Sequence, residues 1–132
     1  VFLLLEGLRR RGHRVVLFCR PGSRCADEAA RRDLEHVVVP MANDADWRGF
    51  SRLATTFREF PLDLVHLHTG RVNWLGGLAA WRSGIPAVST RRMDREVKPN
   101  WRTRIIYGRF VRRVVSISPA VTERLRAGGV WL

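Results

Sequence analysis

Two histidines separated by one residue, His66 and His68, are the first side chains whose types and spacing suggest chemistry. They belong to the segment 63–70, which has the pattern of a buried strand followed by an abrupt polar turn. Residues two apart on a strand face the same side, so both imidazoles can reach one ligand or metal ion. The neighbouring sequence supplies no third metal ligand. The pattern therefore favours a core histidine at position 66 over a zinc site, and leaves His68 between a cleft-edge role and a structural one.

Thr69 and Gly70 follow the same strand and precede a predicted helix over residues 71–83. The free N–H groups at the start of such a helix attract phosphate or carboxylate, and open α/β sheets bind ligands at this edge. Every turn from a strand into a helix has this feature, so it identifies no particular ligand. The fingerprints G-x-G-x-x-G and G-x-x-x-x-G-K-[ST] are absent, which argues against a nicotinamide dehydrogenase or a P-loop NTPase in these residues.

Arg91, Arg92 and Asp94 come directly after the next predicted strand, residues 87–90. Two neighbouring guanidinium groups at the ligand edge suit a phosphate, a carboxylate or an array of sugar hydroxyls. The alternative is a solvated loop in which Asp94 pairs with an arginine. Both interpretations stay open at this stage.

Periodicity and capping residues predict helices that alternate with short strands along the whole chain. The expected helices cover residues 1–12, 26–32, 46–60, 71–83, 101–111 and 119–127, and the expected strands cover 15–19, 36–40, 64–68, 87–90 and 114–118. This alternation predicts an α/β fold with a doubly wound, mostly parallel sheet, built as one domain over residues 1–132.

Local signals place the starts of several of these helices. Ser23 is expected to cap the second helix, Asn43 or Asp44 the third, and Ser118 the last, where Pro119 suits the first helical position. Five apolar residues of the third helix recur at helical spacing and are expected to share its buried face. They are Trp47, Phe50, Leu53, Ala54 and Phe57.

The charge of the chain is strongly basic and unevenly distributed. The formal net charge is +12, of which residues 1–68 contribute +2 and residues 69–132 contribute +10. Such a field favours an anionic partner: a nucleic acid, a membrane surface or a phosphorylated substrate. All basic residues except Lys98 are arginines, so a GC-rich genome that places arginine on solvated faces is an equally good explanation.

Arginines interleave with apolar residues in and after the predicted helix 101–111. A basic amphipathic helix of this kind can lie on an anionic membrane surface, or it can be an ordinary sheet-covering helix with an arginine-rich outer face. The arginines concerned are Arg102, Arg104, Arg109, Arg112 and Arg113. Nucleic-acid binding is disfavoured, because no DNA- or RNA-binding motif accompanies the charge and the aromatic residues have core-like spacing.

Composition narrows the class of protein further. No uncharged apolar run approaches the roughly 18–20 residues of a membrane span, and the apolar start lacks the charge order of a signal peptide. Cys19 and Cys25 form neither a disulfide framework nor a zinc motif, which favours a reducing, cytoplasmic setting. The sequence opens inside a helical pattern and closes as an apolar run begins, so both ends are expected to be cut.

Four segments, taken in order, resemble signatures of GT-B glycosyltransferases. Residues 8–17 (LRRRGHRVVL) resemble L-x-x-x-G-H-x-V, and residues 63–68 (DLVHLH) resemble D-V-V-H-x-H. Residues 84–94 (GIPAVSTRRMD) resemble G-I-P-V-V-x-T-x-H/R-x-D, and residues 114–121 (VVSISPAV) resemble V-I-A-V-S-x-A-V. Together they cover nearly the whole chain. The sequence is similar to the N-terminal, acceptor-side domain of a family 4 glycosyltransferase, a Rossmann-like half of the GT-B fold.

The resemblance implies a retaining, metal-independent and cofactor-free transfer of a sugar from a nucleotide-sugar to a glycan or lipid-linked acceptor. It implies cell-envelope glycan or lipopolysaccharide synthesis in the cytoplasm, with peripheral contact at the inner membrane face. The family's histidine after the Pro-x-Val strand falls at Arg92, where a guanidinium can bind donor or acceptor but is a poor proton shuttle. Ser118 matches a serine with a structural role. The catalytic residues stay unassigned.

The same resemblance places a first strand with a Gly-rich loop before Val1, and a donor-binding domain after Leu132. These 132 residues are therefore expected to show no turnover by themselves. The alternative from another class of protein is a non-catalytic Rossmann-like module that binds an anionic ligand or nucleic acid.

Overall fold

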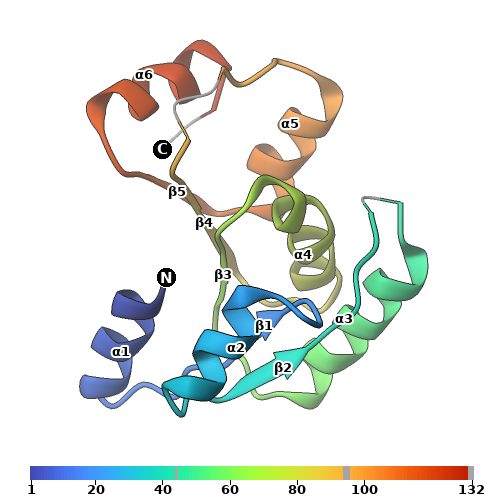
Figure 1. Cartoon of the computed structure of the whole chain (residues 1–132). Coiled ribbons are helices and arrows are strands. Elements are labelled where there is room, and N and C mark those ends of the chain that lie inside the picture. The colour runs from blue at the N-terminus through green and yellow to red at the C-terminus, as the bar shows by residue number, and fades with distance from the viewer. Residues whose placement is uncertain (44, 94–95, 131–132) are drawn as a thin grey trace. The chain divides into compact units, whose positions relative to one another are not determined.

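The computed structural model describes residues 1–43, 45–93 and 96–130. Helices and short parallel strands alternate along the chain, as the sequence predicts (Figure 1). The chain divides into two compact units, Val1–Ala42 and Asn43–Leu132, and each is described by itself. The predicted α/β class is therefore confirmed, with every described strand pair parallel.

The first unit contains α1 (Phe2–Arg10), β1 (Leu17–Cys19), α2 (Arg24–Arg31) and β2 (His36–Val38). The two strands pair in parallel, with Leu17 opposite His36. The Ser23 side chain accepts a hydrogen bond of 3.3 Å from the Ala26 N–H and so caps α2, as predicted. The small core of this unit consists of Cys19, Ala29, Leu34 and Val39.

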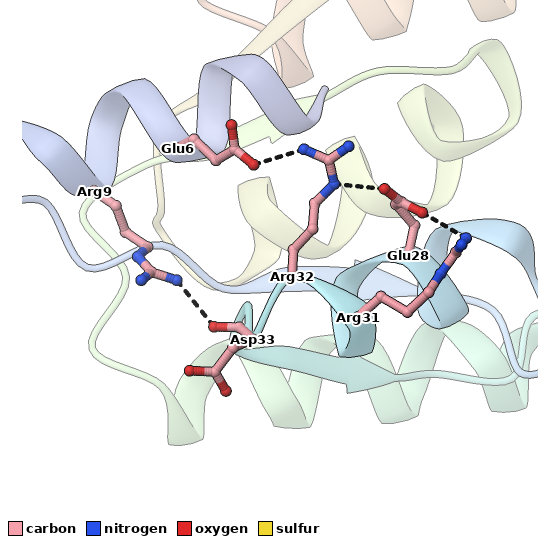
Figure 2. A network of polar contacts seen from close by, with 6 residues as sticks. All are labelled: Glu6, Arg9, Glu28, Arg31, Arg32 and Asp33. Atoms are coloured by element: carbon pink, nitrogen blue, oxygen red, sulfur yellow. Dashed lines mark hydrogen bonds and ion pairs between the residues drawn. The ribbon is translucent and has the colours of Figure 1, made fainter.

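A network of polar side chains joins α1 to the end of α2 (Figure 2). The Arg32 guanidinium donates to Glu6 on α1 at 2.6 Å and also contacts Glu28 on α2. Arg9 donates to the backbone carbonyl of Asp33 at 2.9 Å. The hydrogen bond from Arg32 holds the pKa of the Glu28 carboxyl below its ordinary value. This network fixes the turn after α2, where Asp33 has the left-handed φ of 50°.

The second unit carries the larger sheet. Its elements are α3 (Trp47–Glu59), β3 (Val65–Leu67), α4 (Gly70–Arg82), β4 (Ala87–Arg91), α5 (Trp101–Ile105), the π-helical turn η1 (Ile106–Phe110), β5 (Arg113–Ser116) and α6 (Pro119–Ala127). The strands lie in the order β3-β4-β5, all parallel, with Leu67 opposite Ser89 and Arg91 opposite Ser116. Alternate strand residues are buried, and these form one face of the sheet.

The helix α4 comes unusually close to the sheet and to η1. A Cβ at Gly76 would lie 2.9 Å from Leu67 Cδ2, and one at Gly77 would lie 3.1 Å from Phe110 Cβ. Both glycines are buried, so they permit an approach that any larger side chain would prevent. Helix α4 also packs against α3 and η1. It is therefore the central helix of this unit.

Two expectations about α3 are wrong. Its N-cap is Asp46, whose side chain accepts from the Gly49 N–H at 2.8 Å, whereas Asn43 accepts from the Ala45 N–H in the preceding turn. Asp44 lies outside the described residues. Trp47 is 71% exposed, because it is the first helical residue and lies beyond the buried stripe of Leu53, Ala54 and Phe57.

The predicted helix 101–111 is also corrected. It is α-helical only as far as Ile105 and then widens into η1, in which the Val111 N–H bonds to the Ile106 carbonyl at 2.9 Å. Arg112 follows this turn, and Arg113 already belongs to β5. The two arginines are therefore not on the helix. At the other end of the unit, Ser118 and Pro119 start α6 as predicted.

Candidate functional site

Three parallel strands end side by side in the second unit. Their carboxyl ends lead into His68–Gly70 after β3, Arg92 after β4 and Ser116–Ser118 at the end of β5. The register brings the segments after β3 and β4 together, because Leu67 pairs with Ser89. This is the edge at which parallel α/β sheets bind ligands.

His66 and His68 lie on the same side of β3, with ring centroids 4.1 Å apart. His66 Nε2 contacts Thr90 Oγ1 on the neighbouring strand at 2.7 Å, and His68 Nδ1 contacts Arg92 Nη2 at 3.1 Å. His66 is thus a partly buried histidine bonded to a side chain, not to the backbone. Among the described residues, no group of three His, Cys, Asp or Glu side chains is placed to hold a metal ion.

Both imidazoles favour the neutral form. Burial lowers the pKa of His66 below its ordinary value, and the charge of Arg92 lowers it further. Burial, with added contributions from His66 and Arg92, lowers the pKa of His68 to about 4. Burial disfavours a charged imidazole, and a neighbouring cation adds to the effect. At neutral pH the two rings are therefore uncharged.

The start of α4 follows His68 directly. Thr69 is its N-cap, and its hydroxyl accepts a hydrogen bond of 3.4 Å from the Val72 N–H. Gly70 is exposed at the first helical position, and a Cβ added there would have no neighbour within 4 Å. The helix therefore begins with an open face at Gly70 on the ligand edge, while the N–H groups of Val72 and Asn73 are already bonded to Thr69.

A polar hollow of about 240 Å³ lies between the start of α4, the end of β4 and the helical segment α5–η1. It is lined by Gly70, Asn73, Arg91, Met93, Glu96, Val97, Lys98, Asn100, Thr103, Ile106 and Tyr107. The amide of Asn73 donates to Tyr107 OH at 3.4 Å and its carbonyl accepts from Ser89 Oγ at 3.1 Å. Ser89 is fully buried and Asn73 is 5% exposed. A buried polar network therefore forms part of the wall of the hollow.

Sequence reasoning missed Asn73 and Tyr107, which line the hollow, and Ser89, which is bonded to Asn73. A signal was present, because Asn73 interrupts an otherwise apolar helix face and Ser89 occupies an inward position of β4. Polar residues at core-facing positions need a hydrogen-bond partner, and their partners mark a shared network. Tyr107, by contrast, reaches this network only through the geometry of η1.

The two adjacent arginines take different roles. Arg91 lines the hollow beside Asn73, whereas Arg92 contacts His68. Successive residues of an extended strand point to opposite faces, so the pair does not close on one anion. Asp94, the third residue expected here, lies outside the described residues.

A second, more open hollow of about 450 Å³ lies where β5 passes into α6. Here the Ser118 hydroxyl accepts from the Val121 N–H at 3.3 Å, and Ser116 and Thr122 share a hydrogen bond of 2.6 Å. Ser118 is therefore a helix cap, which is the structural role that its position in the sequence implied.

The predicted basic surface combines arginines with tryptophans. Arg102 lies over the rings of Trp74 and Trp101, at 5.1 and 5.6 Å from their centroids, and Arg109 lies 5.0 Å from the centroid of Trp81. Trp101 is 61% exposed. Arg104, Arg112 and Arg113 are exposed as well. No helix in the described part of the chain is both long and apolar enough to cross a membrane.

Comparison with known proteins gives one result that covers almost the whole chain. The model of Glycosyltransferase Family 4 matches residues 1–130. Comparison with curated proteins and with solved structures gave no significant match. The family match agrees with the parallel α/β architecture and with polar groups gathered at the carboxyl edge of the sheet. The chain therefore belongs to glycosyltransferase family 4.

Proposed function

We propose that this chain supplies the acceptor-side domain of a retaining, metal-independent glycosyltransferase. The enzyme would transfer a sugar from a nucleotide-sugar to a glycan or lipid-linked acceptor in cell-envelope or lipopolysaccharide synthesis. The observation that carries the proposal is the polar hollow at the carboxyl edge of β4, in a chain of this family. Its amide, hydroxyl and cationic side chains are the groups that bind sugar hydroxyls and phosphate.

The hollow offers both kinds of contact to one ligand. Asn73 and Tyr107 are joined by a hydrogen bond and lie in its wall, so their positions are fixed before a ligand arrives. Arg91 and Lys98 line the same hollow and favour an anionic oxygen, while Glu96 can accept from a hydroxyl. A phosphorylated or lipid-diphosphate-linked sugar combines these features. We therefore propose it as the acceptor class.

The test separates binding from turnover. Binding of a sugar phosphate to the 132-residue chain is followed by NMR, and transfer is assayed with the polypeptide of the full reading frame and labelled nucleotide-sugars. We expect binding by the chain, transfer by the full polypeptide and no turnover by the 132 residues alone. Absence of transfer for every donor, together with steeply salt-dependent oligonucleotide binding, would instead support a nucleic-acid-binding module.

Tyr107→Phe tests the hollow as the acceptor site. Removal of one hydrogen bond of about 0.5–1.5 kcal/mol should raise the acceptor KM about two- to tenfold and change kcat less. The measurement is a set of initial rates at varied acceptor concentration. Ser51→Ala removes an exposed hydroxyl from α3 and is the matched control. An unchanged acceptor KM in a folded Tyr107→Phe protein would place the acceptor elsewhere.

We further propose that the surface formed by Trp101, Arg102, Arg104 and Arg109 of α5–η1, extended by Arg112 and Arg113, contacts the cytoplasmic face of an anionic membrane. Phe110 and Val111 are buried, so this segment does cover the interior of its unit. Its outward residues are nevertheless arginines beside exposed tryptophan, a combination suited to the lipid headgroup region. The same segment would therefore cover the sheet with one face and contact the membrane with the other.

Neutralising one of these arginines should weaken membrane binding measurably. Arg109→Gln is expected to cost about 1 kcal/mol of binding to anionic vesicles, or about fivefold in affinity. Co-sedimentation with phosphatidylglycerol vesicles at low salt measures this. Arg52→Gln removes the same charge from exposed α3 and should change binding less. Equal losses of affinity for the two substitutions would show that vesicle binding depends on net charge and not on this surface.

A further inference from the structure

Four polar side chains form a continuous line on the face of the sheet opposite its buried residues. Thr90 contacts His66 at 2.7 Å, the His66 and His68 rings lie 4.1 Å apart, and His68 contacts Arg92 at 3.1 Å. His66 and His68 are two apart along β3 and its extension, and Thr90 and Arg92 are two apart along β4 and its extension, so all four lie on the same face. The last contact of this line, between Arg92 and His68, bears on which ring nitrogen of His68 carries the proton.

The identity of the partner assigns the protons of His68. A guanidinium carries only N–H donors and remains charged at any ordinary pH. A nitrogen that contacts it at hydrogen-bond distance must therefore offer a lone pair, so Nδ1 of His68 is unprotonated. A neutral imidazole with a bare Nδ1 carries its proton on Nε2.

We propose that Arg92 is a positioning residue that holds His68 as a neutral Nε2–H donor for an oxygen of the sugar ligand that accepts a hydrogen bond. The ligand part of this inference rests on the proposed glycosyltransferase function, whereas the tautomer part does not. His68 in this state has no lone pair to accept a proton at Nε2 and does not act as a general base there. Its role is to orient an oxygen, as the guanidinium of Arg92 also does with its remaining N–H groups.

The chemistry shared by the possible ligands is an oxygen that accepts hydrogen bonds. A phosphate oxygen and a sugar hydroxyl both qualify, and two separate probes distinguish them: inorganic phosphate and a neutral methyl glycoside. Their effects are compared at the same residue. A larger effect of phosphate assigns an anionic group to this position, and a larger effect of the glycoside assigns a hydroxyl.

The experiment is a long-range ¹H–¹⁵N NMR spectrum of the histidine side chains in the 132-residue chain, with His68 assigned by a His68→Asn variant. In the unaltered protein we expect a single Nε2–H tautomer at neutral pH. In Arg92→Met we expect a mixture of tautomers, and a pKa that rises but stays below the usual value, because burial is the largest cause of the shift. Arg92→Lys keeps a donor and should restore much of the single tautomer.

The control is Arg82→Met, which removes the same charge from the exposed end of α4. It should leave the His68 spectrum unchanged. A His68 tautomer and titration that do not respond to Arg92→Met would overturn the positioning role. In that case Arg92 only lies beside the ring.

The ligand part is tested on the same spectra. Phosphate or glycoside should shift the His68 Nε2 signal, with affinity about two- to tenfold weaker in Arg92→Met. A correct tautomer without any ligand response would overturn the ligand assignment while leaving the positioning of His68 by Arg92 established. Transfer activity of the full polypeptide is assayed separately. Activity of the full polypeptide without a ligand response at His68 would reject the ligand part of this inference and not the proposed function.

Discussion

The variant Leu67→Ala is expected to lose about 2–5 kcal/mol of the free energy of unfolding. Leu67 is 1% exposed at the carboxyl end of β3, where α4 approaches so closely that a Cβ at Gly76 would lie 2.9 Å from its Cδ2. The truncated side chain leaves a cavity between strand and helix. Because α4 is also packed against α3 and η1, it is not free to move in and fill that cavity.

Chemical denaturation followed by circular dichroism measures this loss. Leu64→Ala is the matched control, because Leu64 is 51% exposed one residue before the same strand. Its effect should stay within about 0.5 kcal/mol. Similar losses for the two variants would contradict the packing of Leu67 against the glycine pair.

Gly128→Ala is expected to destabilise the chain by about 1–3 kcal/mol through overpacking. A Cβ at Gly128 would lie 2.6 Å from Val97 Cβ and 2.8 Å from the Val97 carbonyl oxygen. A backbone oxygen is not the flexible end of a side chain, so the segment around Val97 must shift. Since Val97 lines the polar hollow, acceptor binding should weaken together with stability.

Thermal unfolding and sugar-phosphate binding are the two measurements for this substitution. Gly108→Ala, in η1, is its control, because a Cβ there would have no neighbour within 4 Å, whereas Gly128 is the C-cap of α6 and faces Val97. It should be neutral or slightly stabilising. A stable Gly128→Ala protein with unchanged binding would show that the segment around Val97 accommodates the extra methyl group without affecting the hollow.

The sequence predicted the elements of the fold because their signals are local. Ser23 and Ser118 cap the helices they were expected to cap, and the strand after Asp63 lies where its apolar run indicated. The error at the start of α3 arose because two neighbouring side chains can each accept a backbone N–H. Asp46 and Asn43 both accept backbone N–H groups near the start of α3, and only the three-dimensional path of the turn decides which one caps the helix.

The candidate site was predicted only where it follows the strand ends. His68, Thr69, Gly70, Arg91 and Arg92 could be named because parallel strands place their carboxyl ends together. Their roles as ligand contacts stay predictions. The sequence analysis did not predict that Arg91 and Arg92 face opposite sides of the sheet, although strand alternation alone indicated it.

The contact between Asn73 and Tyr107 could not be derived from the sequence. The two residues are 34 positions apart, and the bond between them depends on how α4 packs against η1. Neither a periodicity nor a motif reports that packing. The same holds for Arg102 and Arg109, whose arginine pattern was evident but whose contacts with Trp74, Trp101 and Trp81 were not.

The π-helical turn at Ile106–Phe110 bears on how this chain should be aligned with its relatives. A π-turn holds an additional residue compared with an α-turn, so it behaves as a one-residue insertion in a helix. A relative shorter by one residue here would continue as a regular α-helix, in which every later side chain is rotated by about 100°. A tyrosine aligned with Tyr107 in such a relative would then not occupy the same position in space. We therefore expect the length of the segment between Asn100 and Val111, more than residue identity, to distinguish relatives that share this hollow from those that do not.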